Sequence, residues 1–76
     1  MLQIDGYQYR LCGLIYYGSN HFTARIVTEN QKVWFSDGMT NGRAYSLEGD
    51  LIDMTLAQLA TASNTYKLSM VFYVRV

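Results

Sequence analysis

The chain has 76 residues, of which half are apolar, and its six basic and six acidic side chains cancel. This length allows a single small domain, residues 1–76, and the apolar content argues against disorder. Balanced charge argues against binding to nucleic acid or to an anionic membrane surface, because both need a sustained positive field. The apolar runs are also far too short to span a bilayer.

The chain contains one cysteine and one histidine, Cys12 and His21. A single cysteine excludes a disulfide within the chain, and the histidine has no Cys, Asp or Glu at ligand spacing. We therefore predict no metal and no other cofactor. The first residues also lack the basic and apolar stretches of a secretion signal. Together these features favour an intracellular protein, in the cytoplasm or the nucleus.

The first half of the chain predicts three strands in a meander, because runs of aromatic and β-branched residues alternate with Gly and Asn clusters. The first strand is expected at 7–17, and residues 18–20 (Gly-Ser-Asn) suit a short hairpin loop that tolerates positive φ. A second strand is expected at 21–27. After a polar turn at 28–31, a third strand is expected at 32–36.

A loop and one short helix are predicted next. Residues 37–43 are dense in turn formers, and a short strand is expected at 44–47. A helix near 53–62 is indicated by apolar residues that recur close to the helical period, namely Leu51, Met54 or Thr55, Leu56, Leu59 and Ala60. Asp50 or Asp53 is the expected N-cap, and Ser63 with Asn64 is the expected stop. This helix is expected to pack on one face of the sheet.

The last segment, from Tyr66 to Arg75, returns to a strand pattern with period two. Its apolar residues Leu68, Met70, Phe72 and Val74 are expected on one side of the strand. The elements together predict a mostly β (α+β) fold. It consists of a small twisted antiparallel sheet of about four to five strands with one short helix.

Three segments resemble, in order, three parts of the ubiquitin-specific proteases. Residues 9–27 (YRLCGLIYYGSNHFTARIV) resemble the family's histidine box, in which a YxLxG strand precedes GHYxxxV. Residues 33–37 (VWFSD) are similar to its WYxFDD segment, and residues 69–75 (SMVFYVR) resemble the AYLLFYVR strand that ends those catalytic domains. Asn20 replaces the usual glycine before the histidine, and Gly38 replaces the second aspartate.

The resemblance implies a papain-like cysteine peptidase that hydrolyses ubiquitin conjugates, with a fold like the C-terminal sheet of that family. In such a site a thiolate attacks the carbonyl carbon, an imidazole moves the proton, and a carboxylate or amide orients the imidazole. The family positions imply His21 as the base and Asp37 as the orienting carboxylate.

The turn at 28–31 decides whether these two residues can meet. A three-residue loop would place Thr23 opposite Asp37 and make His21 its diagonal neighbour on the same face of the sheet. A loop of two or four residues would shift the pairing and separate them.

The nucleophile is missing, because no segment resembles the family's NxGNTCFxN box. Cys12 lies in a predicted strand among apolar neighbours, where a thiol stays protonated and inert, so we do not assign it as the nucleophile. The chain is therefore interpreted as a fragment or relic of a cysteine-type deubiquitinating peptidase, inactive by itself. Its expected partners are ubiquitin or ubiquitin conjugates, and a Cys-bearing partner segment. The alternative is a non-catalytic protein-binding or homo-oligomerising β module.

Overall fold

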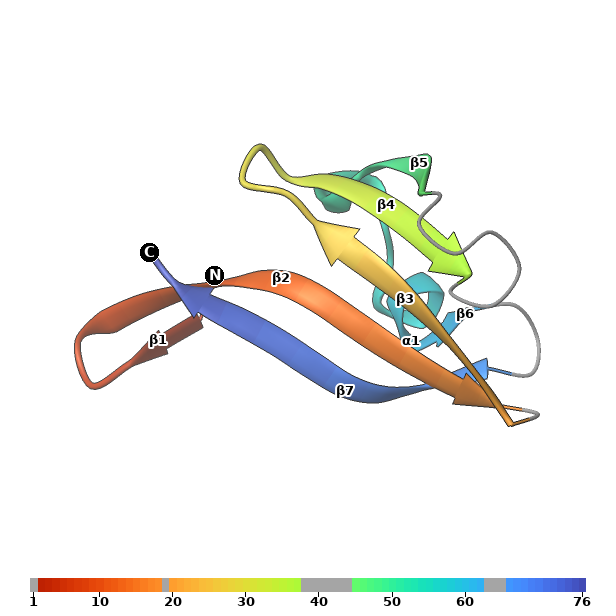
Figure 1. The fold of residues 1–76 in the computed structure, drawn as a ribbon. Coiled ribbons are helices and arrows are strands. Elements are labelled where there is room, and N and C mark those ends of the chain that lie inside the picture. The colour runs from red at the N-terminus through yellow and green to blue at the C-terminus, as the bar shows by residue number, and fades with distance from the viewer. Residues whose placement is uncertain (1, 19, 38–44, 63–65) are drawn as a thin grey trace.

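The computed structural model describes residues 2–18, 20–37, 45–62 and 66–76. Within these residues, seven strands form one curled antiparallel sheet, and a 3-10 helix and a short α-helix follow the fifth strand (Figure 1). The elements are β1 (Leu2–Ile4), β2 (Tyr7–Gly18), β3 (His21–Val27), β4 (Lys32–Asp37), β5 (Ser46–Asp50), η1 (Leu51–Asp53), α1 (Leu56–Ala60), β6 (Thr61–Ala62) and β7 (Tyr66–Arg75). The predicted mostly β fold is confirmed.

The strands lie in the order β5-β4-β3-β2-β7-β6, and β1 pairs with β2 outside this path. The sheet has more strands than the predicted four to five because β1 and β6, of three and two residues, were not expected. The turn before β2 contains Asp5 and Gly6, both at positive φ (51° and 84°). An Asp-Gly pair with two positive φ angles is typical of a type I′ hairpin. This dipeptide therefore contained the signal for β1.

The turn between β3 and β4 has the three-residue loop that the sequence left as one of its alternatives. The amide of Thr28 donates to the carbonyl of Lys32, and the amide of Gln31 donates to the carbonyl of Thr28, both at 2.9 Å. Gln31 has a φ of 66°, which is typical of the last residue in a three-residue hairpin loop. The resulting register sets Thr23 opposite Asp37. Because Asp37 is part of this pairing, strand β4 ends at Asp37, one residue later than predicted.

The predicted N-cap of the helix is wrong. Thr55 caps α1, and it forms a capping box in which its hydroxyl accepts from the Gln58 amide and the Gln58 side chain accepts from the Thr55 amide. Asp50 precedes η1 but makes no side-chain capping bond, because its carboxylate binds Lys32 at 2.5 Å. The helix ends at Ala60, and the predicted stop at 63–64 lies outside the described residues.

The remaining boundaries differ from the sequence prediction in smaller ways. Strand β5 covers 46–50 in place of the expected 44–47, and residues 38–44 lie outside the described residues. Strand β7 has the predicted bounds, but Leu68 does not share a side with Met70. A register shift pairs Leu68 with Tyr16 and Met70 with Ile15, which leaves Ser69 as an extra residue. Such a bulge reverses the alternation of side chains.

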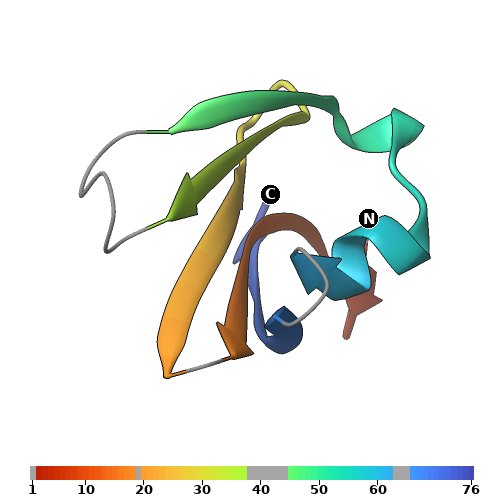
Figure 2. The same ribbon diagram turned by 90° about the vertical axis from the view of Figure 1, so that its right-hand side faces the viewer.

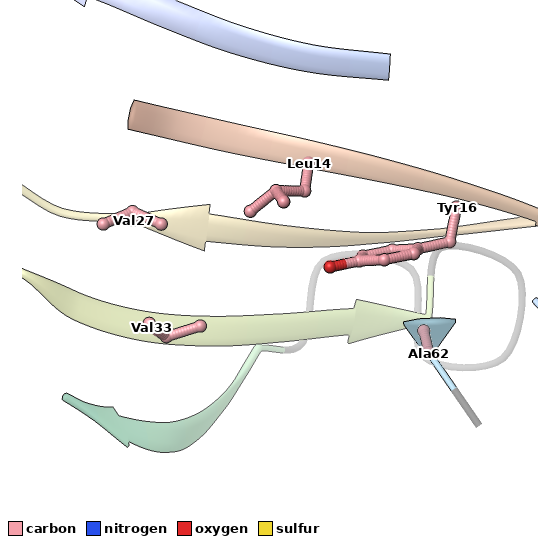
Figure 3. Close-up of a cluster of buried hydrophobic side chains, with 5 residues drawn as sticks. All are labelled: Leu14, Tyr16, Val27, Val33 and Ala62. Atoms are coloured by element: carbon pink, nitrogen blue, oxygen red, sulfur yellow. The ribbon is translucent and has the colours of Figure 1, made fainter. Parts of the chain in front are cut away.

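The core lies on the hollow face of the curled sheet, where η1 and α1 cover it (Figure 2). Its fully buried apolar residues are Leu14, Tyr16, Val27, Val33 and Ala62 (Figure 3). Leu59 of α1 and Leu51 of η1 pack against this cluster. A second bulge leaves Cys12 as the extra residue on β2, which returns Leu11 to the hollow face beside Leu14.

Arg25, at the middle of β3, is only 8% exposed and joins four separate segments. Its guanidinium binds the Glu48 carboxylate through two bonds, from Nε at 2.7 Å and from Nη2 at 3.3 Å. Nη1 donates to the Tyr16 hydroxyl at 2.8 Å and to the carbonyls of Gln58 and Thr61 at 2.8 and 3.1 Å. Strand β3 is thereby connected to β2 and β5, to α1 through Gln58 and to β6 through Thr61.

The pKa values of the two linked side chains reflect this environment. Burial works against the charged form of Arg25, but the hydrogen bonds with Glu48 and Tyr16 outweigh it, so the pKa of Arg25 lies above its ordinary value. Burial raises the pKa of Tyr16, and the hydrogen bond from Arg25 offsets only part of the rise. The Tyr16 hydroxyl in turn donates to the Leu59 carbonyl at 2.7 Å.

Replacing Arg25 should destabilise the fold far more than breaking an exposed ion pair. In Arg25→Met, Glu48 and two carbonyls lose their donors, and the free energy of unfolding should fall by about 3 kcal/mol. The matched control is Lys32→Met, because the Lys32–Asp50 pair is more than 40% exposed on both sides and should contribute less than about 1 kcal/mol. Urea unfolding measures both. Equal losses would show that the Arg25 contacts are not central.

Tyr16 should make the protein sensitive to alkali. Its pKa is higher in the folded than in the unfolded chain, so the native state holds this proton more tightly. The corresponding stability is fully present below about pH 10, the ordinary tyrosine pKa, and is lost as the pH rises through the folded value. Above that pH, the free energy of unfolding should fall more steeply in the wild type than in Tyr16→Phe. Parallel pH profiles would contradict this assignment.

Candidate functional site

His21 is the first residue of β3 and is held there by the hairpin from β2. It pairs with Gly18 across the hairpin, and the preceding Asn20 takes a φ of 60°, as the predicted loop chemistry required. The imidazole is half-buried and meets the ring of Tyr66, the first residue of β7, edge to face with the centroids 5.7 Å apart. Three strands, β2, β3 and β7, therefore determine where this ring lies.

Asp37 is the last residue of β4 and lies at the same end of the sheet as His21. Its backbone is paired with Thr23, two residues along β3 from His21. Residues two apart on a strand share a face, so His21 and Asp37 occupy diagonal positions on one face, on the order of 7–8 Å apart. The described backbone thus brings the two predicted site residues to neighbouring positions.

Thr23 lies between these two residues and was not singled out from the sequence. Its side chain is 2% exposed, and its hydroxyl has no hydrogen-bond partner among the described residues. Burying a hydroxyl without a partner costs free energy, so such a group is a potential donor or acceptor for whatever occupies this end of the sheet. Two features of the sequence pointed to its position, the period-two spacing from His21 and the pairing with Asp37 expected for a three-residue loop.

Cys12 is distant from this arrangement. It is the bulged residue on β2, six positions before Gly18, so it lies roughly 20 Å along the strand from the level of His21. Its thiol donates to the carbonyl of Phe72 on β7 at 3.4 Å. The structure does not bring the only thiol of the chain to the imidazole.

The hollow face carries one polar depression, of about 510 Å³, next to the Arg25 contacts. Glu48, Asp50 and Asp53 line it, and two of these carboxylates are already paired, with Arg25 and Lys32. Among residues 2–18, 20–37, 45–62 and 66–76, no group of three or more His, Cys, Asp or Glu is placed to hold a metal ion. The carboxylates of this depression are engaged mainly in holding β5 to β3 and β4.

In the described part of the chain, no helix has the length and apolar character needed to cross a membrane. Comparisons of the chain with models of protein families, with curated proteins and with solved structures found no match.

Proposed function

We propose that this chain is the His- and Asp-bearing sheet of a papain-like cysteine peptidase that acts on ubiquitin conjugates inside the cell. One observation supports it above the others. The three-residue loop between β3 and β4 gives a register in which His21 and Asp37 become diagonal neighbours on one face. A shift by one residue would have put them on opposite faces.

In this proposal His21 accepts the proton of a cysteine nucleophile and later donates it to the leaving amine. Asp37 orients the ring by accepting a hydrogen bond from Nδ1–H, which leaves Nε2 directed at the thiol. The edge contact with Tyr66 limits rotation of the ring. The roles proposed for His21, Asp37 and Tyr66 therefore depend only on the positions of these residues at this end of the sheet.

The cysteine must come from outside the chain, from a second polypeptide or a longer parent. Cys12 is separated from His21 along β2 and bonded to β7, so it cannot attack a carbonyl next to the imidazole. By itself, the chain lacks the nucleophile and its oxyanion-stabilising amide, and it should not hydrolyse an isopeptide bond.

The tautomer of His21 tests whether Asp37 orients the imidazole ring. His21 is the only histidine, so its ring nitrogens are identified in NMR spectra without ambiguity. Under alkaline conditions, where imidazoles are neutral, a carboxylate acceptor fixes the proton on Nδ1. We expect the Nδ1–H tautomer to predominate in the wild type and the proton to move to Nε2 in Asp37→Ala, which leaves the ring without this acceptor.

Asp53→Ala provides the matched control, because it removes an exposed carboxylate on η1 and should leave the tautomer unchanged. If the wild type and Asp37→Ala show the same tautomer, Asp37 does not orient His21 and the catalytic assignment fails.

The substrate class is tested separately, with ubiquitin as the probe. In a conjugate its C-terminal carboxyl group forms the isopeptide bond that would be cleaved, so binding of the tail should change the NMR signals of His21 and Thr23 at the site end of β3. Ubiquitin shortened by its last residues should have a much smaller effect at equal concentration. If intact ubiquitin leaves these signals unchanged, or if both forms act alike, then ubiquitin is not the substrate.

A second candidate function is a non-catalytic protein-binding β module. The observation that favours it is a run of apolar side chains along β7, from Met70 to Val74, that are all at least 40% exposed. Exposed contiguous apolar residues on an edge strand mark interaction surfaces. The two candidates use different parts of the sheet, so one does not exclude the other.

A further inference from the structure

Among the described residues, no strand covers one edge of β7 over most of its length. Strand β7 pairs with β2 from Tyr9 to Tyr17, but on its other side the described strands reach it only at Tyr66 and Lys67, through β6. In Figure 1 the blue strand β7 lies along the lower border of the molecule. Natural edge strands are often protected by charged residues, proline or a β-bulge. Between Lys67 and Arg75, β7 has no charged residue and no proline, and its bulge at Ser69 lies before the segment from Met70 onward.

The hydrogen-bonding groups on this edge can be identified. The amide of Val76 donates to the carbonyl of Gln8 on β2 at 2.8 Å. In an antiparallel ladder the direction of these groups alternates along the strand, and β7 is regular beyond its bulge at Ser69. The amides and carbonyls of Val71, Tyr73 and Arg75 therefore point away from β2, toward the open edge.

We propose that a second copy of this chain pairs with β7 in antiparallel fashion, about a twofold axis at Tyr73, so that the two sheets become one continuous sheet. The twofold requires that one residue faces its own copy. With Tyr73 in that position, Val71 lies opposite the Arg75 of the second copy. This register uses all three outward-pointing residues of both chains.

Charge excludes the neighbouring register with Val71 on the axis. That register would set Arg75 opposite the Lys67 of the second copy, and like charges directly opposite each other destabilise a strand pair. Lys67 is in addition already paired with Thr61 of β6. In the proposed register no charge faces a like charge, and the Arg75 guanidinium lies over the ring of its own Tyr7, 4.5 Å from the ring centroid.

The side chains also favour a second copy as the occupant. Phe72 comes to lie opposite the Val74 of the other chain, and Met70 opposite its Val76. The exposed fraction is 58% for Met70, 48% for Phe72, 40% for Val74 and 68% for Val76. Pairs of aromatic and aliphatic residues across strands stabilise a sheet. The edge therefore matches its own sequence in hydrogen bonding, charge and apolar contacts.

This inference specifies the partner for the second candidate function, on which it rests, and does not involve the peptidase site. The site end of the sheet is at Tyr66, before the Ser69 bulge, and the proposed pairing uses only the strand beyond it. The result of the tautomer experiment therefore has no bearing on self-association. A monomeric chain that captures another protein would overturn this inference and leave the second candidate standing.

Charge substitutions at Val71 test the pairing. Val71 is 42% exposed and would face Arg75 of the second copy, so Val71→Lys creates two like-charge pairs and Val71→Glu creates two opposite-charge pairs. By sedimentation equilibrium, we expect a wild-type dimer and a dissociation constant at least about tenfold larger for Val71→Lys than for Val71→Glu. Circular dichroism checks that both variants keep the fold. A monomeric wild type, or equal constants for the two variants, would overturn the proposal.

Cysteine cross-linking tests the register. In a Cys12→Ser background, Tyr73→Cys should form an intermolecular disulfide with oxidised glutathione, because the two Cα atoms of a hydrogen-bonded pair are about 5.5 Å apart. Val71→Cys is the matched control, on the same face with similar exposure, and its two copies would be roughly 13 Å apart. Cross-linking of Val71→Cys in preference to Tyr73→Cys would overturn the proposed axis.

Discussion

The buried guanidinium of Arg25 is the constraint on which the rest of the structure depends. A charged group that is nearly enclosed is tolerated only when its donors are satisfied, and here they bind Glu48, Tyr16 and two carbonyls at the α1–β6 junction. Elements that are distant in sequence must therefore meet above the middle of β3. The core cluster has five buried apolar residues in the described part of the chain, so these directed bonds determine where the helical layer lies on the sheet.

The same constraint positions the candidate site. Every second residue of a strand lies on the same face, and β3 therefore carries His21, Thr23 and Arg25 on one face. Fixing the guanidinium of Arg25 also fixes the rotation of the strand about its axis. The β3–β4 loop then determines which residue of β4 comes level with Thr23. The neighbouring positions of His21 and Asp37 therefore result from two local features, a satisfied buried charge and a turn with Gln31 at positive φ.

Local chemistry accounts for what could be predicted from the sequence. The hairpin at Asn20, the strands β3 and β7 and the three-residue alternative for the β3–β4 loop follow from turn formers and period-two patterns. The sequence also contains the signal for the capping box, a Thr at 55 followed three residues later by Gln58, although the prediction assigned the N-cap to an aspartate. The role of Arg25 could not be read, because its partner Glu48 lies 23 residues away and a charged residue in a strand ordinarily indicates a solvated face. The bulge at Ser69 likewise has no signal in the sequence, whereas the bulge at Cys12 lies beside Gly13, and a glycine inside a strand often marks a bulge.

The bulge at Ser69 divides β7 into two parts with different surroundings. Before it, Tyr66 contacts the His21 ring and Leu68 packs against the core. Beyond it, no described strand pairs with the outer edge of β7, and apolar side chains are exposed on both faces. Pairing of two copies about Tyr73 would leave both site ends uncovered. Tyr66 lies seven residues from the axis, so the two imidazoles would be at opposite ends of the joined sheet, roughly 45 Å apart. Self-association through β7 and access of a Cys-bearing partner to His21 are therefore geometrically compatible.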